Sequence, residues 1–398
     1  MGLTIKKNET IDIGRILVFL ILFSELTLSV ISHWAALAVQ GFSFASFALY
    51  LLSKGKLRIS SFAIWYTLFV LITAVSCSLL TKEFDNSILN MLQLLVVFAF
   101  LDQYVEDRRT IENTFNSYII CCLILGTWLM LKSYVANDAR LGTSVSESLP
   151  IWIGSFSSIS FCFCIFLSVF HNSDKQSKRL YLVAAAYSFV ILFLSGSRKY
   201  YLSIIGSLVF YITNFNRGRT RRLLIALTIS VAFLFLIYNN DYMYSVLGRR
   251  IDKLINYTAT HDINDDKSAA VRTIFARTAW ERFQEKPFLG HGMWSWNKVT
   301  GLGTHPHCNY LDLLFSLGIF GFSYYYAFLL GILISFFSRK RKIDANVKRF
   351  WIINVVTMFL MDWFQRSFVF DPVFLFFAFA FWESHRMLDL KMVDPTGR

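Results

Sequence analysis

The chain alternates between long apolar stretches and short polar connections. A helix of about 20 apolar residues is long enough to cross the hydrocarbon core of a bilayer. Twelve stretches have this character, near residues 13–31, 33–52, 60–80, 87–101, 114–133, 149–170, 180–194, 200–214, 222–238, 307–337, 350–364 and 368–382. The pattern therefore predicts an all-α, polytopic membrane protein with about 12 transmembrane helices.

The composition agrees with this pattern. Of the 398 residues, 55% are hydrophobic and only 16% are charged, whereas soluble domains carry roughly 25% charged residues. The chain also holds 41 Phe, 18 Tyr and 10 Trp. This composition excludes a water-soluble catalytic domain, and we expect one integral membrane domain over residues 1–398.

The formal net charge of +13 is distributed unevenly. If the N-terminus is cytoplasmic, segments on that side hold 24 of the 39 basic residues, short loops on the opposite side hold six, and one long loop holds nine. Cytoplasmic loops of membrane proteins are enriched in Lys and Arg. The bias predicts that both termini are cytoplasmic, and it explains the basic excess without nucleic-acid binding.

One long connection separates the ninth and tenth predicted spans. It covers residues 239–306, a length of 68 residues, and loops of this size are usually functional. Within it, residues 268–285 carry apolar side chains four positions apart, which is typical of an amphipathic helix. These side chains are Val271, Phe275, Ala279 and Phe283. We therefore expect an extracytoplasmic loop that contains an amphipathic helix.

Arginines at the same predicted face are candidate anion ligands. The guanidinium group stays charged and donates several hydrogen bonds to an oxygen-rich anion. Arg198 lies in the sequence SGSRK at 195–199, and Arg272 and Arg277 lie on the predicted loop helix. Arg198 is alternatively an interfacial arginine that only anchors a span. Arg277 can pair with Glu281 four residues later, whereas Arg272 has no acidic residue at either helical spacing.

Two histidines precede the tenth predicted span. His305 and His307 can accept a proton from a hydroxyl near neutral pH. A metal site with His291 is the alternative, but no spacing supplies a third ligand. Asp312 lies inside the span, and an intramembrane carboxylate is by default a functional candidate.

Other residues of the last spans are better explained by packing. Gly318 and Gly321 are expected to permit close helix packing. Asp362 and Arg366 are four residues apart and are expected to form a structural ion pair.

Four motifs in order carry a resemblance to a known family. They are SGSRK at 195–199, Arg272, EKPFLGHG at 285–292 and HCNYLDLLFSLGIFG at 307–321. Together they resemble the O-antigen ligase and polymerase superfamily of bacterial cell-envelope membrane enzymes. In that family an SGSR-like turn precedes a long outer loop. The loop has an Arg ahead of a PLxGxG segment and ends in His-Asn-x-Tyr-Leu with a downstream GxxG. Cys308 stands where the family has Asn.

The resemblance implies a metal-independent glycosyltransferase that uses no cofactor. It would act on glycans carried by undecaprenyl pyrophosphate, in the bacterial cytoplasmic (inner) membrane, with a chain-length regulator protein as a partner. The catalytic residues would be His307, Arg272 and Arg198. The substrate-binding residues would be Arg277, His305, His291, Tyr310, Trp294 and Asp312.

Three functions remain open on the sequence. The first is a polymerase that joins repeat units of a surface polysaccharide such as O-antigen or capsule. The second is a ligase that transfers the finished glycan to a lipid core, which would use the same chemistry. The third is a flippase or transporter for lipid-linked sugars. Internal repeats and broken helices would indicate a transporter, and the sequence pattern predicts neither.

Overall fold

The computed structural model describes residues 13–385 except 55–57, 82–86, 139, 172–174, 215–218, 261–266, 304, 339–342 and 370. Within these residues all regular structure is helical and no strand occurs. The predicted all-α class is therefore confirmed.

The first half of the chain forms long helices joined by short connections. The helices are α1 (Ile13–Phe23), α2 (Ser29–Ile31), α3 (His33–Lys54), α4 (Ser61–Ser76), α5 (Ser87–Tyr104), α6 (Arg108–Ala136), α7 (Leu149–Phe170) and α8 (Lys175–Ser195). Wider π-helical turns extend α1 and α4, namely η1 (Ser24–Leu28) and η2 (Cys77–Thr81).

The second half includes several shorter helices. They are η3 (Arg198–Tyr200), α9 (Tyr201–Thr213), α10 (Arg219–Asn239), α11 (Asp241–Met243), η4 (Tyr244–Gly248), α12 (Arg249–Thr260), α13 (Lys267–Glu285), α14 (Trp296–Thr300), α15 (Asn309–Ser335), α16 (Ala345–Met361), η5 (Ser367–Val369) and α17 (Asp371–His385). The long connection between α10 and α15 is thus largely helical, although the sequence predicted one helix there.

Seven helices in the described part of the chain are long and apolar enough to cross a membrane. They are Ile13–Ile31, Ser61–Thr81, Ser87–Tyr104, Arg108–Ala136, Leu149–Phe170, Lys175–Ser195 and Asn309–Ser335. The other five predicted spans are also helical, as α3, α9, α10, α16 and α17. A multi-pass membrane protein is therefore confirmed, while the total of about 12 spans stays a prediction.

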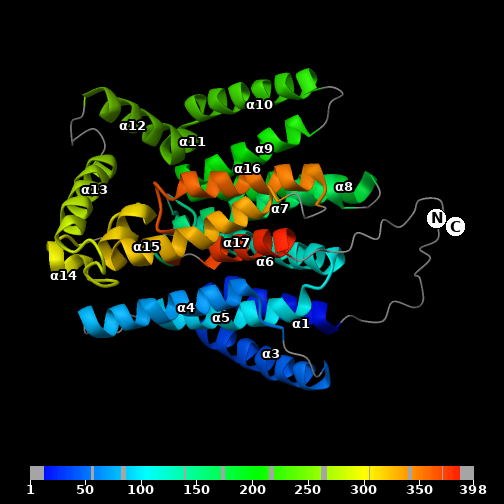
Figure 1. Cartoon of the computed structure of the whole chain (residues 1–398). Coiled ribbons are helices and arrows are strands. Elements are labelled where there is room, and N and C mark those ends of the chain that lie inside the picture. Colours follow the sequence, from blue (N-terminus) through cyan, green and yellow to red (C-terminus); the bar gives the residue numbers. More distant parts are fainter. Residues whose placement is uncertain are drawn as a thin grey trace.

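The long helices lie side by side and give the bundle two distinct ends (Figure 1). Helices α12, α13 and α14 lie at one end, which we call the loop end. The first residues of α1 and the last residues of α17 lie at the opposite end, which we call the terminal end.

Helices α7 and α17 form the centre of the bundle. Helix α7 is buried from Ile153 to Ser168, and α17 is buried from Pro372 to Ser384. Their aromatic rings pack on neighbouring helices. The Phe115 ring of α6 stacks on Phe163 at 4.2 Å and meets Phe379 edge-on at 5.0 Å. Such ring pairs add about 0.5–1.5 kcal/mol each beyond the burial of their area.

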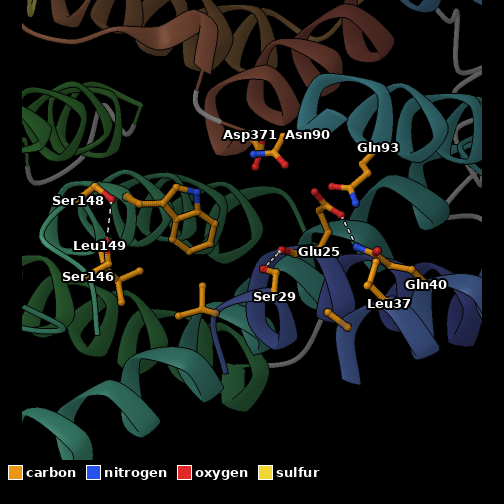
Figure 2. Close-up of a pocket in the computed structure, with 13 residues that line it drawn as sticks. Glu25, Ser29, Leu37, Gln40, Asn90, Gln93, Ser146, Ser148, Leu149 and Asp371 are labelled. Carbon is orange, nitrogen blue, oxygen red and sulfur yellow. Dashed lines mark hydrogen bonds between the residues drawn. The ribbon is translucent and has the colours of Figure 1, made fainter. Parts of the chain in front are cut away.

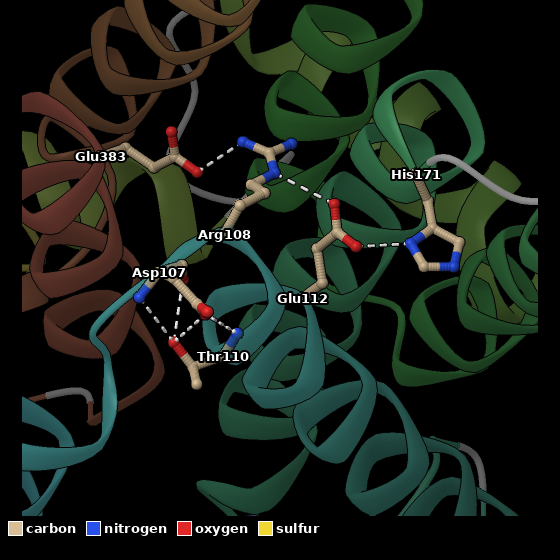
Figure 3. Close-up of polar contacts among 6 residues, drawn as sticks. All are labelled: Asp107, Arg108, Thr110, Glu112, His171 and Glu383. Carbon is tan, nitrogen blue, oxygen red and sulfur yellow. Dashed lines mark hydrogen bonds and ion pairs between the residues drawn. The ribbon is translucent and has the colours of Figure 1, made fainter. Parts of the chain in front are cut away.

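A partly buried ionic network joins three helices at the terminal end (Figure 3). Arg108 donates to Glu112 at 3.0 Å and to Glu383 at 2.7 Å, and Glu112 also pairs with His171. Asp107 begins α6 with a reciprocal capping box, which satisfies backbone N–H groups that the first helical turn leaves open. The network fixes the start of α6 beside the last residues of α7 and α17.

Helix α15 is broken about a third of the way along its length, and the loop before it fills the break. Gly318 has φ 63° and ψ −167°, outside the helical region, so nearby backbone groups lose their helical partners. Residues 287–292 replace these partners through backbone hydrogen bonds. The bonds run from Ile319 N–H to Pro287 C=O (2.8 Å), from His291 N–H to Phe315 C=O (2.8 Å) and from Gly292 N–H to Ser316 C=O (2.9 Å).

Glycines make this backbone contact possible. A Cβ on Gly318 would lie 2.3 Å from the carbonyl group of Phe288, and a Cβ on Gly290 would lie 2.5 Å from the carbonyl carbon of Ser316. The expectation that the helices are unbroken was therefore wrong, and Gly318 admits a loop backbone as well as permitting close packing. Sequence patterns missed the break because the apolar stretch continues through it.

Helix α13 confirms the amphipathic helix predicted over 268–285. Phe275 and Ala279 are buried in one cluster with Trp296 of α14 and Phe315 of α15. Val271 is 38% exposed, so this residue of the predicted stripe does not join the cluster. The stripe fixes α13 against the first half of α15.

Candidate functional site

Three cationic side chains approach two histidines at the loop end. Lys199 belongs to η3, Arg272 to α13, and Arg366 to the connection between α16 and η5. His305 and His307 lie directly before α15, with ring centroids 5.4 Å apart. We call these five residues the basic cluster.

Burial and positive neighbours lower the pKa of both histidines. The pKa of His307 falls to about 4 because of burial first and then because of the charges on Arg272, Lys199 and Arg366. The pKa of His305 falls to about 3, with burial again the main cause and Arg366 the next. Both imidazoles are therefore neutral at pH 7 and able to accept a proton.

Lys199 titrates near neutral pH. Burial and the charge on Arg272 lower its pKa to about 7, against the opposing effect of the Asp362 carboxylate. A lysine in this state is protonated only in part at pH 7. An anion bound nearby would favour the charged form.

Arg366 forms a buried ion pair with Asp312 of α15. Their side chains are 8% and 2% exposed. Ser316 donates to the Asp312 carboxylate at 3.2 Å, and the Arg366 guanidinium lies 4.8 Å from the centre of the Phe368 ring. Asp312 therefore holds a cationic side chain beside the histidines, and its predicted contact with substrate stays a prediction.

The expected ion pair between Asp362 and Arg366 was wrong. Helix α16 ends at Met361, so the two residues do not share one helical face. The Asp362 carboxylate instead accepts hydrogen bonds from the Tyr326 hydroxyl at 2.7 Å and from the Asn309 amide at 3.4 Å. The spacing rule failed because it assumed a continuous helix.

The SGSRK turn is held in place by two arginines. Gly196 has φ 63°, and its carbonyl accepts from Arg250 at 3.0 Å. Arg140 donates to the Ser195 carbonyl at 2.9 Å, while Arg198 donates to the Arg250 carbonyl. These contacts place Arg140, Arg198 and Arg250 close together.

The neighbouring arginines affect the pKa of Arg140. Burial and the charges on Arg250 and Arg198 lower the pKa of Arg140 to about 10. The SGSRK turn therefore directs Arg198 towards an arginine group and Lys199 towards the basic cluster. Of the three residues predicted to be catalytic, Arg272 and His307 are brought together, and Arg198 lies one residue along from Lys199.

A second arginine of α13 has a structural partner. Arg277 pairs with Glu281 at 2.8 Å, with 83% of its side chain exposed. This confirms the predicted pairing. Arg272 acts electrostatically on His307 and Lys199 from the same helix.

His291 contributes to the packing of the loop. Its ring stacks on Phe315 with centroids 5.0 Å apart, and Nε2 lies 2.8 Å from the Arg282 carbonyl. The next residues along the chain also pack inward, because Trp296 is buried and Trp294 is partly buried against the core. A role for His291 or Trp294 in binding sugar stays a prediction.

Tyr310 lies on the first turn of α15. Its hydroxyl donates to the Phe359 carbonyl at 2.8 Å, and its ring stacks on Tyr326 with centroids 4.7 Å apart. The ring of Trp363 also contacts it at 5.2 Å. These contacts join α15 to the end of α16 next to the basic cluster.

The described residues contain no group of three or more His, Cys, Asp or Glu side chains arranged to hold a metal ion. Asp262, Asp265 and Asp266 fall outside the described residues. All six cysteines are buried, and none of them is in a disulfide bond.

Sequence reasoning missed two members of the basic cluster. Lys199 was passed over because Arg198 directly precedes it in the motif, and only the geometry of the turn separates their directions. Arg366 was assigned to the wrong partner. The available signal was an arginine inside an apolar segment, which has to find a buried counter-ion.

A comparison with known families supports the resemblance found in the motifs. Residues 183–326 match the family model of the O-antigen ligases. The match runs from the middle of α8 through the SGSRK turn and the long loop to the middle of α15. No curated protein matches the sequence.

Proposed function

We propose that the protein is a metal-independent glycosyltransferase that polymerises oligosaccharide repeat units carried on undecaprenyl pyrophosphate. The observation that carries this proposal is the basic cluster, in which two neutral histidines lie among Lys199, Arg272 and Arg366. A diphosphate leaving group needs positive charge, and an attacking hydroxyl needs a base. The family match covers all members of the cluster except Arg366.

The loop end would face the outside of the bacterial cytoplasmic membrane, and both termini would be cytoplasmic. The distribution of basic residues favours this orientation. The Arg108 network at the terminal end would then lie on the cytoplasmic side. The substrate lipid would reach the basic cluster from the outer leaflet.

The chemistry would proceed by displacement at the sugar carbon that bears the pyrophosphate. The acceptor hydroxyl attacks this carbon and forms the new glycosidic bond, while the bond from carbon to the pyrophosphate oxygen breaks. His307 takes the proton of the hydroxyl, and the negative charge that develops on the leaving group is stabilised by Arg272, with Arg198 at the neighbouring arginine group. Hydrogen bonds to ionised phosphate strengthen as charge develops.

The bound diphosphate would also adjust the base. In the protein without substrate, positive neighbours hold the pKa of His307 near 4, which makes it a weak base. A diphosphate between Arg272 and Lys199 would offset these charges and raise the pKa of His307 towards neutrality. Proton transfer would then be favoured mainly when the donor substrate is in place.

Two alternatives use the same site. A ligase would transfer the glycan to a lipid core and would add one block without a ladder of lengths. A flippase would move the lipid-linked sugar without forming a bond. Broken helices are common in transporters, where the free backbone groups bind the substrate. At the break in α15, the backbone groups of Phe315, Ser316 and Ile319 instead bond to residues 287–292, so they are not available to a substrate.

The deciding experiment uses the purified protein in liposomes with a lipid-linked repeat unit extracted from the source cells. We expect a ladder of longer lipid-linked products, unchanged when EDTA is added. Arg272→Ala should abolish the ladder, because the leaving group loses a charged partner. Arg282→Ala is the matched control, because this arginine lies on the same helix and pairs with Glu285.

Each other outcome points to a different function. A single addition to a lipid-core acceptor, with no ladder, would favour the ligase. Movement of the lipid across the bilayer without a new bond would favour the flippase. Loss of activity with EDTA that added metal restores would overturn metal independence.

A further inference from the structure

A second polar site lies at the loop end, apart from the basic cluster. It is a cavity of about 350 Å³, within the range of roughly 300–1,000 Å³ that small-molecule pockets occupy. Its walls come from η1, α2, α3, α5, α7, α17 and the segment that leads into α7. The starts of α7 and α17 lie at the loop end because their opposite ends, near His171 and Glu383, are joined through Glu112 and Arg108 at the terminal end.

The lining of this cavity is unusual for a membrane helix bundle. Carboxylates and amides face it from separate helices, including Glu25, Gln40, Asn90, Gln93 and Asp371. In Figure 2, Glu25, Gln40 and Gln93 are grouped on one side, and Asp371 lies beside Asn90. Gln40 donates to Glu25 at 2.7 Å. Polar groups inside a membrane domain generally serve function.

The chemistry of the lining fits a sugar. Carboxylates accept hydrogen bonds from hydroxyl groups, and amides both donate and accept. The indole of Trp152 forms an apolar wall, and aromatic rings offer a large apolar face for packing. Among the described residues no Lys or Arg lines the cavity, so none of them offers a counter-charge to a phosphate there.

A smaller cavity extends this site towards the basic cluster. It has a volume of about 40 Å³ and shares Asn90 and Asp371 with the larger one. Phe368 forms part of its wall, and the Arg366 guanidinium lies over the Phe368 ring. The smaller cavity and Arg366 are therefore neighbours on either side of the Phe368 ring.

A buried hydroxyl at the smaller cavity is available to a ligand. Tyr66 lines this cavity and is fully buried. Its hydroxyl has no hydrogen-bond partner among the described residues. A buried polar group without a partner carries a desolvation cost, which a ligand hydroxyl would remove.

We propose that the cavity between Glu25, Trp152 and Asp371 is a subsite for a neutral sugar of the lipid-linked glycan. Its two carboxyl groups and its amides would hold hydroxyl groups, and the indole would pack on one apolar sugar face. The inference rests on the proposed function, because it assigns the glycan to this cavity and the diphosphate to the basic cluster.

Photo-crosslinking tests the subsite without turnover. The residue Leu37 lines the cavity and is 38% exposed, whereas Leu68 on α4 is 45% exposed and does not line it. Each leucine is replaced in turn by p-benzoylphenylalanine in the full-length protein. The probes are the lipid-linked repeat unit extracted from the source cells and undecaprenyl pyrophosphate without sugar.

We expect position 37 to crosslink the glycan-bearing lipid but not the sugar-free lipid. At position 68 we expect no crosslink to the glycan. Equal crosslinking of both lipids at position 37, or of neither, would overturn the subsite. Because crosslinking needs no catalysis, it fails or succeeds independently of the ladder assay that tests the proposed function.

Kinetics give a second test. Trp152→Ala should raise the KM for the lipid-linked repeat unit about 3- to 10-fold with kcat little changed, the effect of losing one aromatic contact. Trp34→Ala is the matched control, because this indole is 81% exposed. An unchanged KM would contradict the subsite. The cavity would be a cation site instead if three results were found together. The rate would depend on Na⁺, Asp371→Asn would alter that dependence, and position 37 would give no crosslink to the glycan.

Discussion

At the scale of single residues, the basic cluster is governed by the mutual repulsion of its members. Lys199, Arg272 and Arg366 surround two partly buried imidazoles. Each positive charge makes the next protonation less favourable. Without a bound anion, such a site holds fewer protons than its residue types suggest. A dianionic ligand would favour protonation of the same residues.

The two histidines are separable by substitution. We expect His307→Ala to lower the rate of polymerisation about 10²- to 10⁴-fold, the usual contribution of a general base, while lipid-linked substrate still binds. His305→Ala should lower it less, because only His307 stands at the family motif. Single-turnover rates with matched expression and purification measure the difference. If the His305→Ala variant were inactive and the His307→Ala variant kept a near-normal rate of polymerisation, His305 would be the general base.

The dependence of activity on pH follows from the lowered pKa values. If neutral His307 and charged Lys199 are both required, kcat/KM should stay high between their pKa values of about 4 and about 7. It should fall below this window as His307 gains a proton, and above it as Lys199 loses one. A profile of kcat/KM against pH measures both limbs.

A substitution assigns the alkaline limb. Lys199→Arg should remove it or move it well above pH 7, because a guanidinium group stays charged. His305→Ala is the control, since His305 has a pKa of about 3 and does not titrate near pH 7. An alkaline limb that is unchanged in Lys199→Arg would mean that Lys199 is not the group that titrates.

At the scale of elements, hydropathy and periodicity located the helices well but not their interruptions. The stripe that begins at residue 271 predicted α13, because a one-sided helix needs one buried face. The break at Gly318 left no trace in hydropathy, since apolar residues continue on both sides. The partner of Arg366 was also hidden, because Asp312 lies 54 positions earlier and only the folded chain brings them together.

The break in α15 has a direct test. Gly318→Ala should destabilise the protein by at least about 2 kcal/mol, because its backbone angles suit only glycine and the new Cβ would meet the Phe288 carbonyl group at 2.3 Å. Gly331→Ala in the same helix has open space around its Cβ and should be neutral or slightly stabilising. Melting temperatures in detergent compare the two variants. Equal melting temperatures would contradict the docked loop.

At the scale of the whole molecule, the two ends of the bundle differ in how far their positive charges are neutralised by carboxylates. The Arg108 network balances cation with carboxylate at the terminal end, whereas the basic cluster holds more cations than carboxylates. The cavity lined by Glu25 and Asp371 lies at the same end as the basic cluster. The cationic side chains and the cavity are thus separate sites at one end of the bundle. This arrangement suits a ligand with an anionic part and a neutral part.

The orientation of these ends in the membrane is testable by labelling. Ala259→Cys on α12 and Gln176→Cys on α8 place exposed thiols at opposite ends, and the six native cysteines are buried. An impermeant maleimide added to intact cells should label position 259 only, because the loop end is expected outside. Labelling of position 176 in intact cells would reverse the topology, and with it the proposed access of the lipid.

The loop that fills the break in α15 also bears on how the chain is assembled during synthesis. When α15 enters the bilayer, the carbonyls of Phe315 and Ser316 and the N–H of Ile319 lack partners until residues 287–292 dock. Such groups cost several kcal/mol each in hydrocarbon. The span therefore cannot settle fully before the preceding loop has crossed the membrane, so translocation of the loop and insertion of this helix are coupled steps of biogenesis.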